Sequence, residues 1–301
     1  MSASTLKLIF QAIRPATLLT GAAPVMLGAS VGYMSNPKDP DHPQLLIFIV
    51  SVLAVVVMQA AANLVNDAKD AENGVDSSER KGPVRVVQSG LLDLATVKKA
   101  YKFCFVLSIF LSAIIAYYGG IYVFGAALVS ALFAYAYTGG PFPLAYYAMG
   151  EVTAFIFFGL VAVAFSAYLQ ANSWLSIFWL WGVGPGLISA AIMAINNYRD
   201  IDTDRTSGKH TLATIFPKNL AMLFPLIFSF VAIMCPFLIR PEFVKEPFVI
   251  VVSTLLILFL LVKIYPRIKS DNADKLNEAL RMTAMLNLLY CASFACINLF
   301  I

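Results

Sequence analysis

The residues best suited to chemistry lie in two short acid-rich stretches. In the first, NLVNDAKD at residues 63–70, the side chains of Asn63, Asp67 and Asp70 are spaced i, i+4 and i+7, so they share one face of a helix. Carboxylates crowded on one face repel each other and are costly to keep in apolar surroundings. A divalent cation would remove both problems, so the spacing predicts a metal site.

The second stretch, NNYRDIDTD at residues 196–204, repeats this pattern. Asn197, Asp200 and Asp204 fall at i, i+3 and i+7, again on one helical face. The two stretches align with an offset of 130 residues, which suggests an internal repeat. Two oxygen-rich stripes favour Mg²⁺, which takes a few carboxylates and completes its shell with water and phosphate.

Calcium is the obvious alternative ion, because DIDTDRTSGKHT begins like an EF-hand loop. Arg205 stands where that loop has glycine, however, and Thr211 stands where it has glutamate. These two departures favour magnesium over calcium.

Basic residues accompany both stretches, and a bare cation site would not need them. They are Arg80, Lys81 and Arg85 after the first stretch and Arg199, Arg205 and Lys209 within or after the second. They could neutralise the diphosphate oxygens that the metal leaves uncovered, so together the residues indicate a site for a metal–diphosphate complex. Basic residues at helix ends also serve membrane topology alone, and that interpretation stays open for each of them.

The elements that must position these residues are membrane helices. The chain of 301 residues is 60% hydrophobic and 13% charged, whereas soluble domains carry about 25% charged residues. It contains the charge-free runs 15–37, 42–66, 103–150, 152–198, 219–239, roughly 247–264 and 282–301. Two of these runs are too long for one crossing of about 20 residues, and breaks at YYGG (117–120) and QANS (170–173) divide them. We therefore expect an all-α integral membrane protein with nine transmembrane helices in a single domain, residues 1–301.

The distribution of basic residues predicts the orientation of these helices. With the N-terminus in the cytoplasm and the C-terminus outside, 18 of the 21 basic residues lie on the cytoplasmic side and 3 lie outside. Both acidic stretches then follow even-numbered helices and face the cytoplasm. The net charge of +4, with no basic tail, argues against a nucleic-acid partner.

Glu151 is the only acid in the 96 residues between Lys102 and Arg199. A charge at a membrane helix is expensive unless it is used, so we expect Glu151 to orient or deprotonate an acceptor. The alternative is a carboxylate that marks a solvated helix N-terminus. His210 could act as a base, but an exposed loop histidine is the simpler interpretation.

At this point the residues resemble a known family. Asn66-Asp67-x-x-Asp70 followed by Asp76, with the second stretch on a later helix, is similar to the UbiA-type intramembrane prenyltransferases. The strings GVDSSERKGPVR (74–85), YTGGPFPLAYYAMGE (137–151) and NNYRDIDTDRTSGKHTLA (196–213) resemble the branch that prenylates 1,4-dihydroxy-2-naphthoate. Two departures from the wider family pattern are Gly74, where an aspartate is frequent, and Ala68, where an aromatic residue is common.

The resemblance implies a ring of nine helices around a central cavity in the cell's inner or plasma membrane, with the active site facing the cytoplasm. It also implies Mg²⁺-dependent transfer of a polyprenyl group from its diphosphate to the naphthoate with loss of CO₂, giving a demethylmenaquinone. Two Mg²⁺ ions would be held by residues of both stretches, and basic residues would bind the diphosphate. The implied metal ligands are Asn66, Asp67, Asp70, Asp76, Asn197, Asp200 and Asp204, and the implied diphosphate ligands are Arg80, Lys81, Arg85, Arg199 and Lys209. The implied catalytic residues are Asp70, Asp200, Asp204 and Glu151.

Other functions remain open at this stage. Within the family, the acceptor could be 4-hydroxybenzoate or homogentisate, or the protein could be a lipid ether synthase. A cation-coupled transporter would also carry intramembrane carboxylates, although its acids should lie near the midplane and not at one membrane face.

Overall fold

The structure, a computed structural model, describes residues 3–35, 42–73, 82 and 85–300. The long helical segments are α2 (Pro15–Ser35), α3 (Gln44–Asn73), α4 (Leu94–Ala136), α5 (Gly150–Phe155) with η2 (Ile156–Val161) and α6 (Ala162–Ala171), α7 (Ile177–Arg199), α11 (Phe224–Ile239), α12 (Pro247–Phe259) with η4 (Leu260–Ile264) and α13 (Tyr265–Lys269), and α14 (Ala273–Phe300). Short helices join them: α1 (Ala3–Ala12), η1 (Leu144–Tyr146), α8 (Ile201–Thr206), α9 (Leu212–Ile215), α10 (Lys218–Ala221) and η3 (Pro241–Lys245). The described part of the chain contains no strand, only an isolated bridge between Tyr147 and His210. The expected all-α architecture is therefore confirmed.

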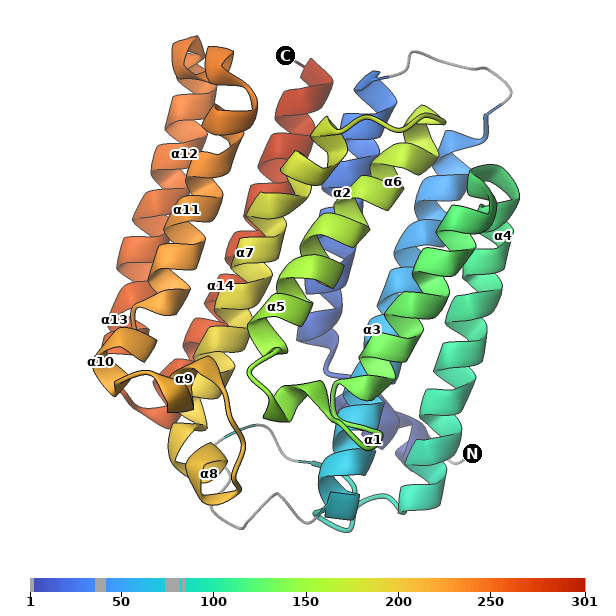
Figure 1. The fold of residues 1–301 in the computed structure, drawn as a ribbon, viewed down its shortest axis with the longest axis vertical. Coiled ribbons are helices and arrows are strands. Elements are labelled where there is room, and N and C mark those ends of the chain that lie inside the picture. The colour runs from blue at the N-terminus through green and yellow to red at the C-terminus, as the bar shows by residue number, and fades with distance from the viewer. Residues whose placement is uncertain (1–2, 36–41, 74–81, 83–84, 301) are drawn as a thin grey trace.

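Eight helical segments in the described ranges are long and apolar enough to cross a membrane. The longest, α4, has 43 residues, which is too long for one crossing. Gly120 interrupts it with a φ of 70°, a left-handed value that glycine adopts readily, and the chain turns back there (Figure 1). The YYGG break is thus confirmed, and the chain is a multi-pass membrane protein. The count of nine, the central cavity and the orientation of the termini stay predictions.

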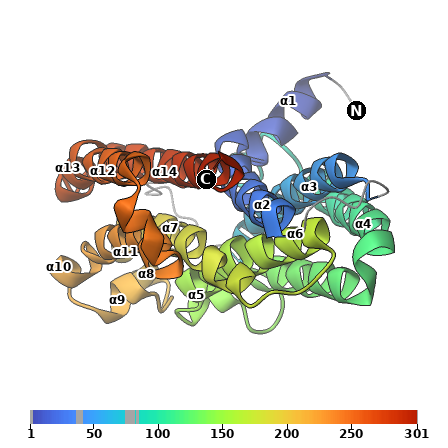
Figure 2. The ribbon, with the colours of Figure 1, turned by 90° about the horizontal axis from the view of Figure 1, so that it is seen from above.

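The helices pack side by side along the bundle axis. Seen along that axis, α14 and α2 lie on one side of the bundle, and α7, α5 and α6 lie opposite (Figure 2). α14 packs against both α2 and α7, and α2 packs against α6. A Cβ atom added at Gly32 of α2 would lie 2.1 Å from the carbonyl oxygen of Ala167 on α6, so only glycine allows this approach. Small residues at contacts are the usual means by which membrane helices pack closely.

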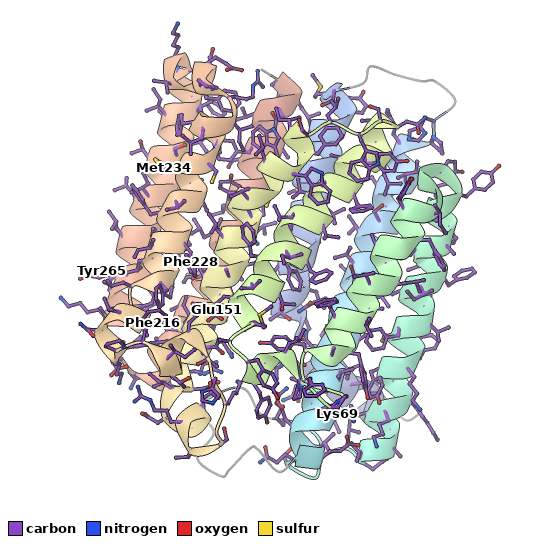
Figure 3. All side chains as sticks on the ribbon, viewed as in Figure 1. Lys69, Glu151, Phe216, Phe228, Met234 and Tyr265 are labelled. Atoms are coloured by element: carbon purple, nitrogen blue, oxygen red, sulfur yellow. The ribbon has the colours of Figure 1, made fainter. Side chains whose placement is uncertain are left out.

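Both acid-rich stretches lie at the same end of the bundle, where α3 ends and α8 and α9 begin (Figure 1). We call this the acidic end. The loop after α4 crosses it and is tied to the segment just after the second stretch. The Ala148 amide donates to the His210 carbonyl at 2.8 Å, and the His210 amide donates to the Tyr146 carbonyl at 3.1 Å. These contacts bring Glu151, at the start of α5, toward this end (Figure 3).

Candidate active site

Asp70, in the last turns of α3, forms an ion pair with Arg85 from the segment between α3 and α4. The arginine side chain is 7% exposed and the aspartate 17%. One predicted metal ligand and one predicted diphosphate ligand are therefore in contact. Such a pair keeps the carboxylate neutralised at a membrane boundary, where an unpaired charge would be costly.

Asp67, one turn earlier, is fully enclosed and holds the main chain next to Arg85. Its Oδ2 accepts the amide of Val86 and its Oδ1 accepts the amide of Val87, each at 3.1 Å. Both carboxylate oxygens thus bind backbone, although the spacing had predicted a metal ligand. Asp67 fixes the segment that brings Arg85 to Asp70.

The two asparagines of the first stretch also contact protein groups. Asn63 donates to the carbonyl of Ile13 at 2.7 Å and to the hydroxyl of Thr17 at 2.9 Å, which ties α3 to the junction of α1 and α2. Asn66, a predicted metal ligand, accepts a hydrogen bond from Thr138 at 2.7 Å. Thr138 lies in YTGGP, which only the family resemblance had marked. The loop after α4 is therefore joined to the first acidic stretch and, through His210, to the segment that follows the second.

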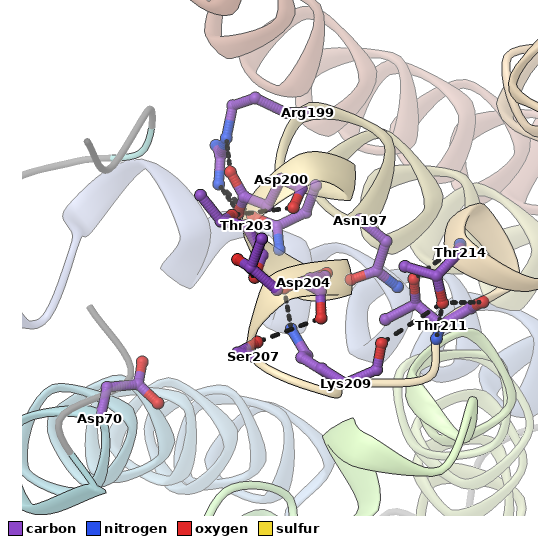
Figure 4. A network of polar contacts seen from close by, with 12 residues as sticks. Asp70, Asn197, Arg199, Asp200, Thr203, Asp204, Ser207, Lys209, Thr211 and Thr214 are labelled. Atoms are coloured by element: carbon purple, nitrogen blue, oxygen red, sulfur yellow. Dashed lines mark hydrogen bonds and ion pairs between the residues drawn. The ribbon is translucent and has the colours of Figure 1, made fainter. Parts of the chain in front are cut away.

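In the second stretch, Arg199 holds Asp200 with a two-pronged contact (Figure 4). Its Nε donates to Oδ1 at 2.8 Å and its Nη2 donates to Oδ2 at 2.6 Å. The guanidinium also donates to Asn196 at 2.9 Å and to Asn277 of α14 at 2.7 Å. Arg199, predicted as a diphosphate ligand, is thus bound to protein groups on every side-chain nitrogen.

Asp204 and Lys209 form another ion pair at the acidic end. The Lys209 ammonium donates to Asp204 Oδ1 at 3.2 Å, and the Lys209 amide donates to the Asp204 carbonyl at 2.9 Å (Figure 4). Within the described chain, Asp204 Oδ2 is buried and has no hydrogen-bond partner. Burial raises the pKa of Asp204 above its ordinary value, and the charge of Lys209 opposes this shift. This oxygen is well suited to meet a cation.

Glu151 lies beside the second stretch and is 3% exposed. Its Oε1 accepts a hydrogen bond from Asn197 at 2.9 Å, while its Oε2 is buried without a hydrogen-bond partner among the residues described. Asn197, predicted as a metal ligand, therefore orients Glu151 in this structure. A Cβ added at Gly150 would lie 3.2 Å from the Tyr137 hydroxyl, which places that phenol close to the start of α5.

The donor set fits a magnesium ion that arrives with phosphate. No group of three His, Cys, Asp or Glu side chains close enough to hold a metal occurs among the residues described. Asp70 lies on a separate helix, apart from Asp200 and Asp204 (Figure 4). Mg²⁺ is commonly held by one or two carboxylates together with water and substrate phosphates. Each stretch supplies carboxylates of this kind, and the buried Oδ2 of Asp204 receives no hydrogen bond from the residues that the structure describes. Asp76, Arg80 and Lys81 lie outside the described residues.

The chain as a whole is similar to one known protein family. The sequence pattern of the UbiA prenyltransferase family matches residues 22–289, which is most of the chain. The chain belongs to the UbiA prenyltransferase family. It is therefore an enzyme, a membrane-embedded prenyltransferase, and membership argues against a cation-coupled transporter.

Two relatives of this UbiA-family chain carry the name of the branch that its sequence motifs resemble. A Haemophilus influenzae protein named 1,4-dihydroxy-2-naphthoate octaprenyltransferase is 32% identical over 76% of this chain and 76% of its own length. An Escherichia coli protein of the same name is 32% identical over 67% of this chain and 66% of its own length.

Solved structures of UbiA homologues share the fold. A homologue from Aeropyrum pernix K1 superposes with a TM-score of 0.70 at 15% identity, covering 92% of this chain and 96% of that one. A homologue from Archaeoglobus fulgidus, bound to GPP and Mg²⁺, gives 0.68 at 16% identity, covering 97% and 99%. At these identities the likeness confirms the helical arrangement.

Proposed function

We propose that this prenyltransferase moves a polyprenyl group from polyprenyl diphosphate to 1,4-dihydroxy-2-naphthoate, with loss of diphosphate and CO₂. The product of this step is the hydroquinone form of a demethylmenaquinone, which a separate two-electron oxidation converts to the quinone. One observation carries the proposal. At one end of a membrane bundle, carboxylates from two separate stretches of the chain form ion pairs with buried or half-buried arginine and lysine side chains. The names of the relatives support the acceptor, and the Archaeoglobus homologue with GPP and Mg²⁺ supports the donor and the metal.

The diphosphate end of the donor belongs at the acidic end. Asp70, Asp200 and Asp204 would hold Mg²⁺, as two ions in the arrangement that the resemblance implies, and Arg85 and Lys209 would bind diphosphate oxygens left uncovered. Mg²⁺ bound there would stabilise the charge that develops on the departing diphosphate. On substrate binding, Arg85 would leave Asp70 and Lys209 would leave Asp204, and both basic side chains would then contact diphosphate oxygens.

The acceptor belongs beside Glu151. When the carbon–oxygen bond to diphosphate breaks, the allylic carbon becomes electron-poor and must be kept from water, which the apolar helices around the site would do. The buried Glu151 carboxylate would take the proton of the acceptor hydroxyl, so that the ring attacks through its carboxyl-bearing carbon. The new carbon–carbon bond forms, CO₂ leaves with restoration of the aromatic ring, and Glu151 returns the proton.

The acidic end would face the cytoplasm of a cell with an inner or plasma membrane. The ratio of 18 basic residues to 3 supports this orientation. The polyprenyl chain would lie among the apolar side chains of the bundle and the surrounding lipid.

The test is an assay of the full-length protein in detergent or in lipid nanodiscs. The reaction contains 1,4-dihydroxy-2-naphthoate, a radiolabelled polyprenyl diphosphate and Mg²⁺, and matched reactions contain EDTA or the Asp70→Ala variant. We expect a prenylated, decarboxylated product with the wild type, and loss of product with EDTA or the variant. Release of ¹⁴CO₂ from carboxyl-labelled acceptor gives an independent readout.

Parallel reactions with 4-hydroxybenzoate, homogentisate and a glycerol phosphate lipid acceptor distinguish the alternatives within the family. Turnover of one of these without turnover of the naphthoate would replace the acceptor in this proposal. Activity that survives both EDTA and Asp70→Ala would contradict the metal–diphosphate mechanism itself.

A further inference from the structure

We propose that Asn277, on the last helix, is a positioning residue that orients Asp200 through Arg199. The inference rests on the proposed function, in which Asp200 is a metal ligand. It gives α14 a part in the site, although no candidate site residue from the sequence lies beyond His210.

The first step is the contact between Arg199 and Asp200. Two separate nitrogens of the guanidinium reach two separate oxygens of the carboxylate, at 2.8 and 2.6 Å. Such a two-pronged contact fixes the plane of the carboxylate as well as its position. The direction in which Asp200 presents its remaining lone pairs therefore depends on the orientation of the arginine.

The second step is the way in which the arginine is held. Its remaining nitrogen, Nη1, donates to the side-chain oxygen of Asn277 at 2.7 Å, and Nη2 also donates to Asn196 at 2.9 Å. Asn196 lies on the same helix as Arg199, so the contact with Asn277 is the one that ties the guanidinium to another helix. Because the guanidinium is planar, it cannot rotate without straining several of these bonds at once.

The third step concerns what this arrangement leaves for a metal. An ionised carboxylate offers about four lone-pair sites, and the two donors of Arg199 use two of them. Asp200 can therefore bind Arg199 and a cation together. The Arg199 side chain is 1% exposed and all three of its nitrogens already donate to protein groups, which favours a role in holding Asp200 over a role on the diphosphate. Groups that hydrogen-bond to metal ligands typically change metal affinity or activity by about 10–100-fold when they are lost.

A purely structural contact between helices is the competing explanation, and the same helix pair offers a matched control. Asn287, ten residues further along α14, is fully buried and donates to Ser189 of α7 at 3.3 Å. Asn287→Leu removes a polar contact between α7 and α14 outside the acidic end. Asn277→Leu removes the acceptor of Arg199, and Asn277→Asp keeps an oxygen acceptor in the same place.

The experiment measures binding of Mn²⁺, a paramagnetic substitute for Mg²⁺, by electron paramagnetic resonance on the full-length protein with a non-hydrolysable prenyl diphosphate analogue. Thermal unfolding is recorded in parallel. We expect Asn277→Leu to raise the Mn²⁺ dissociation constant about 10–100-fold, Asn277→Asp to restore most of the affinity, and Asn287→Leu to leave it within about twofold of wild type.

Equal weakening of Mn²⁺ binding by both leucine variants would overturn the inference, as would lower thermal stability in Asn277→Leu with unchanged Mn²⁺ affinity. If the wild type bound no Mn²⁺ with the analogue, the proposed function would fall and this inference with it. These outcomes separate a failure of the positioning role from a failure of the metal–diphosphate site.

Discussion

Removal of the Asp67 carboxylate should release the segment that carries Arg85. In Asp67→Ala, the amides of Val86 and Val87 both lose a charged acceptor, and the Val86 side chain beside them is fully buried. A hydrogen bond to a charged group contributes about 1.5–3 kcal/mol, so the loss of two gives about 3–6 kcal/mol. Water that enters the opened segment would hydrogen-bond to the freed amides and offset part of this loss, so we expect the free energy of local opening to fall by about 3 kcal/mol. At 1.4 kcal/mol per factor of ten, this corresponds to about 100-fold more frequent local opening.

Amide hydrogen exchange of the protein in nanodiscs measures this opening directly. We expect the amides of residues 86–89 to exchange about 100-fold faster in Asp67→Ala, with an increase in the KM for prenyl diphosphate because Arg85 is no longer held. Asp67→Asn, which keeps one acceptor oxygen, should give an intermediate rate. The control is Asp93→Ala, since Asp93 also accepts a backbone amide, that of Thr96 at 2.7 Å, but does so at the start of α4.

The opposite result would support the role of metal ligand that the spacing predicts for Asp67. If exchange of residues 86–89 stayed at the wild-type rate while the Mg²⁺ concentration for half-maximal activity rose more than about tenfold, Asp67 would be a metal ligand, and its hydrogen bonds to the two amides would be incidental.

Three further predictions concern the remaining groups of the site. Glu151→Gln keeps the shape of the side chain but removes the base, so kcat should fall by about 10²–10⁴-fold with little change in the KM for prenyl diphosphate, as initial rates will show. Burial raises the pKa of Asp204, so a proton competes with Mg²⁺ at a pH where an ordinary aspartate is already ionised. In metal titrations, the Mg²⁺ concentration for half-saturation should therefore fall as the pH rises through that pKa. Asp204→Asn should remove this pH dependence. Arg85→Lys should keep part of the affinity for prenyl diphosphate in binding assays. Arg199→Lys should weaken Mn²⁺ binding, because lysine cannot reproduce the two-pronged contact with Asp200. Weaker Mn²⁺ binding in Arg85→Lys together with weaker prenyl diphosphate binding in Arg199→Lys would contradict the roles assigned to the two arginines.

The membrane helices and their breaks could be predicted because they depend on local composition. Charge-free runs identify the spans, and Gly120 turns the chain at the YYGG break. The same local pattern placed Asn63, Asp67 and Asp70 on one helical face. Spacing does not say what that face meets, and the structure shows three different neighbours: the α1–α2 junction, two backbone amides and an arginine.

The departure at Ala68 has a physical explanation that only the packing reveals. Ala68 is fully buried in a cluster with Val65, Val86 and Tyr101. An aromatic side chain at this position would overfill the cluster and push on Val86, whose amide Asp67 holds. The small residue is thus matched to the segment that carries Arg85.

The two buried arginines of the site are held in different ways, and the difference separates their roles. Asp67 holds the main chain next to Arg85 through the amides of Val86 and Val87, and the Arg85 side chain forms an ion pair with Asp70. Arg199 is fixed by its side chain, whose nitrogens are shared among Asp200, Asn196 and Asn277. In the proposed function, Arg85 would turn from Asp70 to an arriving diphosphate while Asp67 keeps the neighbouring main chain in place. A guanidinium tied to two helices can do so only by breaking the contacts that orient Asp200. The same residue type therefore suits diphosphate binding at one stretch and positioning of a metal ligand at the other, a distinction that two aligned and similarly charged stretches of sequence do not reveal.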